Sequence, residues 1–251
     1  MKKYELITHD ITKTSTHAVL GKHYGTVDMV ITSPPYNVGI EYETTDDKAP
    51  RVDYETFTDR YISICHSMLR PDGRIAVNVA NTGRNPYVDN VSMVSRALER
   101  YGFTLRGHII WDKAASAGPS CAWGSWLSAA NPTLRDVNEF IIVAHKESPK
   151  KESRGTSDIE RDDFMEWTKS IWSMRTESAK RIGHPAPFPV ELPQRLIKLY
   201  TYVGDTVFDP FSGSGSTGVA AVRNGRYYIG MDSSQVYNEL ADERISAVID
   251  L

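Results

Sequence analysis

The sequence predicts an α/β fold with a doubly wound, mostly parallel sheet and one antiparallel strand. Short apolar runs alternate with amphipathic segments along most of the chain, which is typical of parallel strands joined by helices. One apolar run, residues 138–145, lies too close to the preceding strand for a crossover helix, so we expect it to pair antiparallel. The 251 residues suffice for one large α/β domain, and we assign residues 1–251 to it.

In the first half of the chain, residues 27–31 form a short buried run that predicts a strand. Residues 54–69 carry apolar side chains at helical spacing, and Pro71 and Gly73 should end that helix. The other elements predicted here are strands at 4–8, 74–79 and 104–111 and a helix at 88–101. We interpret the polar residues 38–53 as a loop over the turn that follows the strand at 27–31.

The second half begins with two irregular segments. Residues 112–138 contain Gly-Pro and Asn-Pro pairs and predict a long ordered loop, and residues 146–183 predict a short insertion. The other predicted elements are a short helix around 164–171, helices at 191–202, 214–224 and 236–249, and strands at 206–209 and 226–232.

Composition and charge exclude several classes of protein. With 40% hydrophobic residues and no apolar run of about 18 residues, we expect a globular cytoplasmic protein without a membrane anchor. A formal net charge of −3 means that contact with nucleic acid requires a local basic surface. Cys65 and Cys121 are too few for a disulfide scaffold, their spacing matches no zinc site, and we expect no metal.

A stiff turn, residues 32–37 (TSPPYN), follows the strand at 27–31. Pro34 and Pro35 lack a backbone N–H and fix φ, so they neither extend a strand ladder nor begin a helix. The Ser33 hydroxyl and the Tyr36 ring flank them at the carboxyl end of a strand. Together these groups form a compact site for a planar polar molecule, although local sequence alone also fits an ordinary surface turn.

A glycine-rich unit lies far along the chain, at residues 208–218. Its glycines follow the pattern Gly-x-Gly-x-x-Gly between a strand and a helix, and Asp232 ends the next strand. This arrangement binds adenosine-bearing cofactors, because glycine lets the backbone approach the ligand and the carboxylate accepts hydrogen bonds from ribose hydroxyls. A loop that serves only tight packing is the alternative.

The residues around this unit favour a cationic cofactor. An NAD-dependent oxidoreductase is the first alternative, but Asp209 and Pro210 place a negative charge and a missing N–H before the glycines. A pyrophosphate requires N–H donors, whereas a cation is attracted by a carboxylate. Asp10 adds a carboxylate at the end of the strand at 4–8, where open sheets bind ligands, although a cap on a turn explains Asp10 at least as well.

Three motifs in this order resemble the amino-methyltransferases of DNA, in the permuted group whose catalytic motif precedes its cofactor motif. Residues 32–36 are similar to the catalytic motif, residues 208–215 to the S-adenosyl-L-methionine loop, and residues 184–189 to the segment that covers the methionine moiety. Weaker similarities occur at residues 110–113, 123–126 and 138–143. The resemblance spans nearly the whole chain and implies a Rossmann-like methyltransferase fold.

The resemblance also assigns roles to individual residues. The implied catalytic residues are Ser33, Pro34, Pro35 and Tyr36. The implied cofactor-binding residues are Asp10, Thr32, His184, Pro185, Phe188, Asp209, Pro210, Phe211, Ser212, Gly213, Ser214, Gly215, Asp232 and Ser233.

The chemistry expected at the turn is methylation of an exocyclic amine. The lone pair of such an amine is delocalised into the base, so acceptors on its N–H groups must favour the tetrahedral form; Ser33 Oγ and the Pro34 carbonyl are suited to this. The base must first leave the duplex, and Tyr36 could then stack on it. In the family, serine in place of aspartate at Ser33 is associated with cytosine N4, whereas aspartate is associated with adenine N6.

Methylation at cytosine carbon 5 is disfavoured, because it needs a cysteine nucleophile. Cys65 falls in the apolar stripe of a helix, and neither cysteine follows a proline in a turn. A catalytically silent DNA-binding module remains as a further class.

The expected partner is double-stranded DNA, and the resemblance also admits a homodimer and a cognate restriction endonuclease. We expect the loop at 113–136 and a short target-recognition insertion at 146–183 to contact DNA, with packing beneath the loop as the alternative for its tryptophans. The predicted DNA-binding residues are Lys113, Trp123, Trp126, Arg135, Lys150, Lys151, Arg175 and Lys180.

Overall fold

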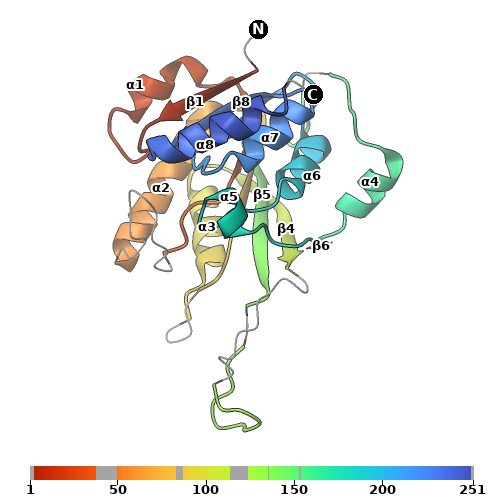
Figure 1. Cartoon of the computed structure of the whole chain (residues 1–251). Coiled ribbons are helices and arrows are strands. Elements are labelled where there is room, and N and C mark those ends of the chain that lie inside the picture. The colour runs from red at the N-terminus through yellow and green to blue at the C-terminus, as the bar shows by residue number, and fades with distance from the viewer. Residues whose placement is uncertain are drawn as a thin grey trace.

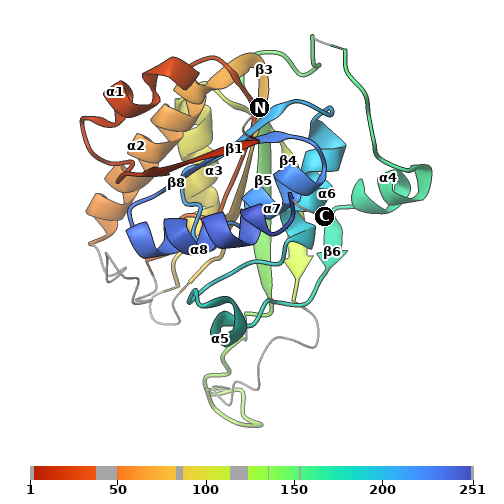
Figure 2. The ribbon, with the colours of Figure 1, turned by 45° about the horizontal axis from the view of Figure 1, so that its top comes forward.

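The fold, taken from a computed structural model, is a three-layer α/β sandwich (Figures 1 and 2). The structure describes residues 3–37, 50–82, 87–113, 124–134, 136–152 and 154–249. Across this part of the chain the sheet has eight strands in the order β1-β8-β7-β2-β3-β5-β4-β6. The strands are β1 (Tyr4–Thr8), β2 (Val27–Thr32), β3 (Leu69–Val79), β4 (Thr104–Asp112), β5 (Asn138–His145), β6 (Ile171–Ser173), β7 (Thr206–Asp209) and β8 (Tyr227–Asp232).

Helices cover both faces of the sheet because successive strand residues point to opposite sides. On one face, Val30, Ile75 and Phe208 pack with α1, α2 and α3; on the other, Met29, Ile31 and Val207 pack with α6, α7 and α8. The helices are α1 (Thr16–Leu20), α2 (Arg51–Met68), α3 (Asn90–Arg100), α4 (Arg161–Trp167), α5 (Ala179–Ile182), α6 (Glu191–Tyr200), α7 (Ser216–Arg223) and α8 (Gln235–Ser246), with a 3₁₀ turn, η1, at Gly21–His23. No helix of the described ranges is long and apolar enough to cross a membrane.

The predicted fold class is confirmed, including the antiparallel strand. Within the described ranges, β5 alone runs against its neighbours β3 and β4, and the other pairs are parallel. The short elements α1, η1, α5 and β6 were not predicted, since three to five residues carry too little periodicity. Ile171, which was predicted to end a helix, instead begins β6 and pairs with Ile110 of β4. Of the predicted loop at 38–53, residues 51–53 begin α2 and residues 38–49 lie outside the described ranges.

The helix ends before Pro71 as predicted, at Met68, but β3 begins at Leu69 and not at Arg74, because the chain passes directly from α2 into β3. Leu69 pairs with Val27, and the register with β2 shifts before Arg74. A proline fits such an irregular position because no ladder hydrogen bond is needed from its nitrogen. The Pro71 carbonyl accepts instead from two backbone N–H groups after β5.

The carboxyl ends of β2, β7 and β8 meet at one edge of the sheet, which brings residues distant in sequence together. β2 lies between β7 and β3, so the proline turn after Thr32 is adjacent to the glycine-rich loop after Asp209. The Thr32 hydroxyl donates to Asp209 Oδ1 at 2.8 Å, and the Thr217 hydroxyl donates to Oδ2 at 2.7 Å. This buried tie fixes the turn, the loop and the first residues of α7 relative to one another.

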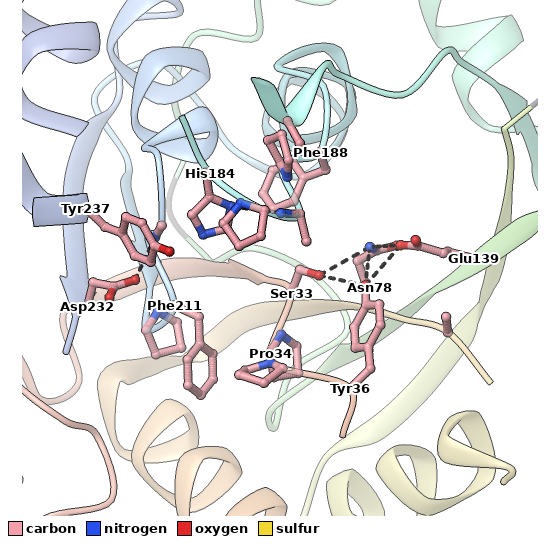
Figure 3. A pocket seen from close by; sticks show the side chains of 18 of the residues that line it. Ser33, Pro34, Tyr36, Asn78, Glu139, His184, Phe188, Phe211, Asp232 and Tyr237 are labelled. Carbon is pink, nitrogen blue, oxygen red and sulfur yellow. Dashed lines mark hydrogen bonds between the residues drawn. The ribbon is translucent and has the colours of Figure 1, made fainter. Parts of the chain in front are cut away.

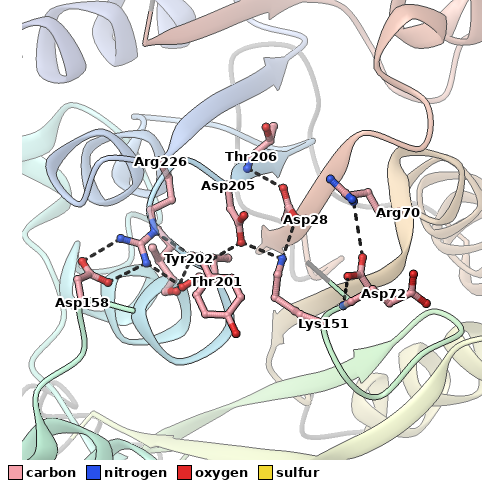
Figure 4. A network of polar contacts seen from close by, with 12 residues as sticks. Asp28, Arg70, Asp72, Lys151, Asp158, Thr201, Tyr202, Asp205, Thr206 and Arg226 are labelled. Carbon is pink, nitrogen blue, oxygen red and sulfur yellow. Dashed lines mark hydrogen bonds and ion pairs between the residues drawn. The ribbon is translucent and has the colours of Figure 1, made fainter. Parts of the chain in front are cut away.

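The opposite, amino-terminal edge is held by a buried ion-pair network (Figure 4). Lys151 Nζ lies 2.7 Å from Asp28 Oδ1 on β2 and 2.8 Å from Asp205 Oδ2 just before β7. Its side chain is only 6% exposed, so the charge is neutralised inside the protein. Nearby, Arg226 donates to both carboxylate oxygens of Asp158, each at 2.8 Å.

This network argues against the predicted DNA contact of Lys151, whereas DNA contact by the exposed Lys150 stays a prediction. Lys151 is buried and paired, and Lys150 is exposed at the same amino-terminal edge, away from the carboxyl ends of the parallel strands. The segment at 146–183 crosses from this edge along α4 and β6, and its last residues, from Thr176, reach the opposite edge. Only this last part lies beside the cavity described below.

Replacing Lys151 with methionine should destabilise the fold, because Asp28 and Asp205 would be left buried without their cation. Removing one partner of a buried pair typically costs about 3 kcal/mol or more. Urea unfolding of Lys151→Met measures the loss, with the exposed neighbour Lys150→Met as the matched control, expected within about 0.5 kcal/mol of the parent protein. Equal stabilities of the two variants would contradict the network's structural role.

Candidate active site

A cavity of about 680 Å³ opens at the carboxyl edge of the sheet, between the proline turn and the glycine-rich loop (Figure 3). It is formed by the ends of β2, β3, β7 and β8 and by the segment before α6. The predicted residues that line it are Asp10, Ser33, Pro34, Pro35, Tyr36, Lys113, His184, Pro185, Phe188, Pro210, Phe211, Gly213, Asp232 and Ser233. Sequence motifs separated by about 200 positions thus converge on one space.

Asp232 anchors the wall formed by the glycine-rich loop. Its Oδ2 accepts from the Gly213 N–H at 2.8 Å and its Oδ1 from the Ser234 N–H at 2.9 Å. These two bonds hold the carboxylate between the glycine-rich loop and the start of α8. Asp10 both lines the cavity and accepts from the Thr12 N–H at 2.9 Å, so it also serves as the turn cap that its sequence position allowed.

His184 and Phe188 approach this wall from the opposite side (Figure 3). The His184 ring packs edge-on against Tyr237, with ring centroids 4.6 Å apart. Burial, with the Arg244 charge as a smaller cause, lowers the pKa of His184 to about 4. Gly213 must be glycine, because its φ is +47° and a Cβ would lie 2.9 Å from His184 Nε2.

Several predicted cofactor residues do not line the cavity, and their contact with a cofactor stays a prediction. Asp209 is fully buried and its oxygens accept from Thr32, Thr217 and the Phe211 N–H, so no carboxylate faces the cavity from this position. Thr32 is likewise buried in that tie. Burial raises the pKa of Asp209 to about 6, while the two threonine donors act to lower it.

The remaining predicted residues of the loop serve packing. Ser212 accepts from the buried Tyr228 hydroxyl at 3.0 Å, and Ser214 accepts from Arg244. Gly215 leaves no space for a Cβ, which would lie 2.8 Å from Ala241. These three residues hold the loop against β8 and α8, and they do not line the cavity.

The catalytic half of the cavity contains a hydrogen-bonded cluster around the proline turn (Figure 3). Ser33 Oγ lies 2.7 Å from the Tyr36 hydroxyl, which donates to Glu139 Oε2 at 3.0 Å. Asn78 Nδ2 donates to the Tyr36 hydroxyl at 2.8 Å and to Glu139 Oε2 at 2.5 Å. Lys113 Nζ pairs with Glu139 Oε1 at 2.5 Å.

The backbone of the turn is fixed by two further donors. Tyr54 on α2 donates to the Pro35 carbonyl at 2.7 Å, and Asn90 at the start of α3 donates to the Tyr36 carbonyl at 3.2 Å. The Pro34 carbonyl accepts no hydrogen bond from the residues that the structure describes. Ser33 and Pro34 both line the cavity, and Ser33 Oγ accepts from Asn78 Nδ2 at 3.4 Å.

Sequence reasoning missed Asn78 and Glu139, although both are polar residues within apolar strands, at the end of β3 and near the start of β5. A polar side chain inside a buried run is the signal that could have identified them. The other lining residues not predicted as site residues are His9, Ile11, Thr12, Phe57, Ala80, Asn81, Thr82, Trp111, Asp136, Thr176, Glu177, Ala179, Ala186, Pro187 and Tyr237.

The predicted DNA-facing residues divide into three groups. Lys113 lines the cavity but is paired with Glu139, whereas Arg175 and Lys180 are exposed near and on α5, beside the cavity. Trp126 is 64% exposed on residues 124–134, which extend beyond the ends of β4 and β5 (Figure 1), so it is not packed beneath the loop. Trp123 and Arg135 lie outside the described residues.

Neither metal chemistry nor a cysteine nucleophile finds support at this site. The described ranges contain no group of three or more His, Cys, Asp or Glu side chains placed to hold a metal ion. Cys65 is fully buried in α2, where burial raises the pKa of its thiol, so it is unsuited to attack a base. Cys121 lies outside the described residues.

Solved structures place this architecture among the methyltransferases. The putative DNA modification methylase TTHA0409 of Thermus thermophilus, solved in complex with S-adenosyl-L-methionine, superposes with a TM-score of 0.75 at 25% identity, covering 98% of this chain and 94% of that protein. The cytosine-N4-specific PvuII DNA methyltransferase superposes with a TM-score of 0.71 over 100% of this chain and 92% of that protein, and at 18% identity it shows the fold alone.

Sequence comparison then identifies the family. The profile of the N6/N4 DNA methylases matches residues 27–243. The type II methyltransferase M.MjaVI of Methanocaldococcus jannaschii is 38% identical over 161 residues, which cover 62% of this chain and 80% of that protein. The chain belongs to this family of DNA methylases, which favours methyl transfer over the hydride transfer of the oxidoreductase alternative.

The lowered pKa of His184 predicts a dependence of stability on pH. Between pH 4 and 6.5 the unfolded chain binds a proton at this position that the folded chain does not, so stability falls as the pH falls. Between pH 7 and 5 the parent protein should lose about 1–2 kcal/mol more than His184→Gln. Urea unfolding at both pH values tests this, with the exposed His17→Gln as control; parallel losses in the parent and His184→Gln would contradict it.

Proposed function

We propose that this DNA methyltransferase transfers a methyl group from S-adenosyl-L-methionine to the exocyclic N4 amine of a flipped cytosine in duplex DNA. The observation that carries the proposal is that Ser33 and Pro34 line the same cavity as Asp232 and Gly213. The turn and the glycine-rich loop thus border one space. Cytosine is proposed over adenine because serine, and not aspartate, occupies the first position before the two prolines.

The cavity suits an adenosine cofactor that carries a positive charge. When bound, S-adenosyl-L-methionine supplies an electrophilic methyl group on a sulfonium. Asp232 lines the cavity at the end of β8, where a carboxylate accepts ribose hydroxyls in such folds, and Gly213 allows the loop backbone to approach the ligand. Because its pKa is about 4, His184 is neutral near pH 7 and adds no charge that would repel a cation.

The turn provides the acceptors for the amine. As the nitrogen becomes tetrahedral, its hydrogens need acceptors that are already in place, and Ser33 Oγ and the Pro34 carbonyl are held by the bonds to Tyr36, Tyr54 and Asn90. The Tyr36 hydroxyl is fixed by Asn78 and Glu139, which orients the ring that we propose stacks on the flipped base.

Contact with DNA is proposed for the exposed groups around the cavity mouth. Arg175 and Lys180 are available to neutralise phosphates, and Trp126 projects from the same edge of the sheet. The proposed recognition segment is correspondingly limited to residues 175–183 and the loop between β4 and β5. The type II relatives support a role in restriction and modification, with a cognate endonuclease and a homodimer as proposed partners.

The test is to identify the methylated nucleoside. The protein is incubated with labelled S-adenosyl-L-methionine and mixed-sequence duplex DNA, which is digested and analysed by mass spectrometry. We expect N4-methylcytosine, and Ser33→Ala should slow transfer by about 10²-fold or more with cofactor affinity retained. N6-methyladenine as the sole product would reject the cytosine assignment, and label in protein or RNA would reject the substrate class. A Ser33→Ala rate equal to the parent's would remove Ser33 from the mechanism.

A further inference from the structure

The hydrogen bonds from Ser33 to Glu139 have a defined direction. Glu139, as a carboxylate, can only accept, so the Tyr36 hydroxyl donates its single hydrogen to Glu139 Oε2. Ser33 must then donate its own hydrogen to Tyr36, at 2.7 Å. Ser33 Oγ accepts from Asn78 Nδ2 at 3.4 Å, so one of its lone pairs is left as an acceptor. The carboxylate thus determines, through Tyr36, that the serine hydrogen points toward Tyr36 and that a lone pair is left for the amine.

The surroundings of Glu139 hold this direction in place. Lys113 pairs with Oε1, which leaves Oε2 for Tyr36 and Asn78. The Asn78 amide must point its Nδ2 at the carboxylate, because its oxygen would be repelled there. Glu139 is 8% exposed, on β5 beside β3, so it is an acidic residue at a largely buried site directly behind the proline turn (Figure 3).

For Ser33 to accept a proton from the amine, a second group must accept the proton that Ser33 already carries, and Glu139 can be that group. A hydroxyl is a weaker acceptor than the carboxylate found at this position in other members of the family, and it holds its own proton. Methylation of the amine creates a cationic nitrogen that must lose a proton. Ser33 can take that proton only if it passes its own onward, and the bond to Tyr36 provides the route.

We propose that Glu139 is a positioning residue that acts through Tyr36 to make Ser33 an effective proton acceptor; this rests on the proposed function. The N–CH₃ bond forms as the S–CH₃ bond breaks, and the amine nitrogen becomes cationic. One proton then moves from this nitrogen to Ser33 Oγ, the Ser33 proton moves to Tyr36 Oη, and the Tyr36 proton moves to Glu139 Oε2. The product is a neutral methylamine, and the protonated carboxyl group later releases its proton to solvent.

The test compares single-turnover methylation by the full chain with saturating cofactor and DNA. Glu139→Gln and Tyr36→Phe should each lower the rate about 10- to 100-fold, with the affinities for S-adenosyl-L-methionine and DNA within about twofold of the parent. The double variant should be no slower than the slower single one, because both substitutions interrupt the same chain. Glu166→Gln, the same substitution at an exposed ion pair on α4, is the control and should retain the parent rate.

Chemical rescue separates proton acceptance from a structural role. In Glu139→Ala, which leaves space behind Tyr36, added formate should restore the rate several-fold. The same formate should have no effect on Glu139→Ala combined with Tyr36→Phe, since the hydroxyl that connects the acid to Ser33 is absent. Rescue that is independent of Tyr36, or a Glu139→Gln rate within twofold of the parent, would overturn the proposal. Thermal unfolding and cofactor binding establish that each variant is folded.

The outcomes also separate this inference from the proposed function. If the parent protein methylates adenine N6, the cytosine assignment fails while the dependence of the rate on Glu139 is still measured with that base. If the parent protein transfers no methyl group to DNA, the proposed function fails and the role of Glu139 fails with it. If N4-methylcytosine forms and Glu139→Gln is unimpaired, the function stands and only the role of Glu139 is overturned.

Discussion

The buried contact of Asp209 with Thr32 and Thr217 is the interaction on which the site depends. It joins the end of β2, the end of β7 and the start of α7, and Thr32 and Asp209 are 177 positions apart in the sequence. Burial of Asp209 is unfavourable for its charge and raises its pKa to about 6, and the two hydroxyl donors partly offset that cost. The proline turn and the glycine-rich loop are thereby fixed relative to each other, and this carboxylate does not line the cavity.

The strand order of the sheet explains how the proline turn and the glycine-rich loop, which are far apart in the sequence, lie next to each other. Because β2 lies between β7 and β3, the turn after β2 is adjacent to the cofactor loop on one side and to Asn78 on the other. The antiparallel β5 then brings Glu139, near its start, to the same edge, since its amino end lies beside the carboxyl ends of its neighbours. One edge of the sheet therefore carries the glycine-rich loop, the proline turn and the acidic side chain of Glu139.

Sequence patterns were sufficient for the parts of the fold and site that follow general rules. The alternation of strands and helices predicted the parallel sheet, and the short distance between β4 and β5 in the sequence predicted that β5 is antiparallel. The position of Asp232 at the end of β8 predicted that it lies at the cavity. They failed where tertiary contacts decide orientation. Asp209 points into the protein because Thr217 donates to it, and Lys151 does so because it pairs with Asp28 and Asp205. These contacts form only in the folded chain, so the local sequence does not distinguish either residue from an exposed charged side chain.

The most direct test of this account is the single-turnover methylation rate of Thr32→Val at saturating cofactor and DNA. Valine keeps the shape of the buried side chain but removes the donor to Asp209. If the tie holds the turn against the cofactor loop, the rate should fall about 10-fold or more while cofactor affinity is nearly retained, because small displacements of reacting groups are costly. A Thr32→Val rate equal to that of the parent protein would contradict the central role of this contact.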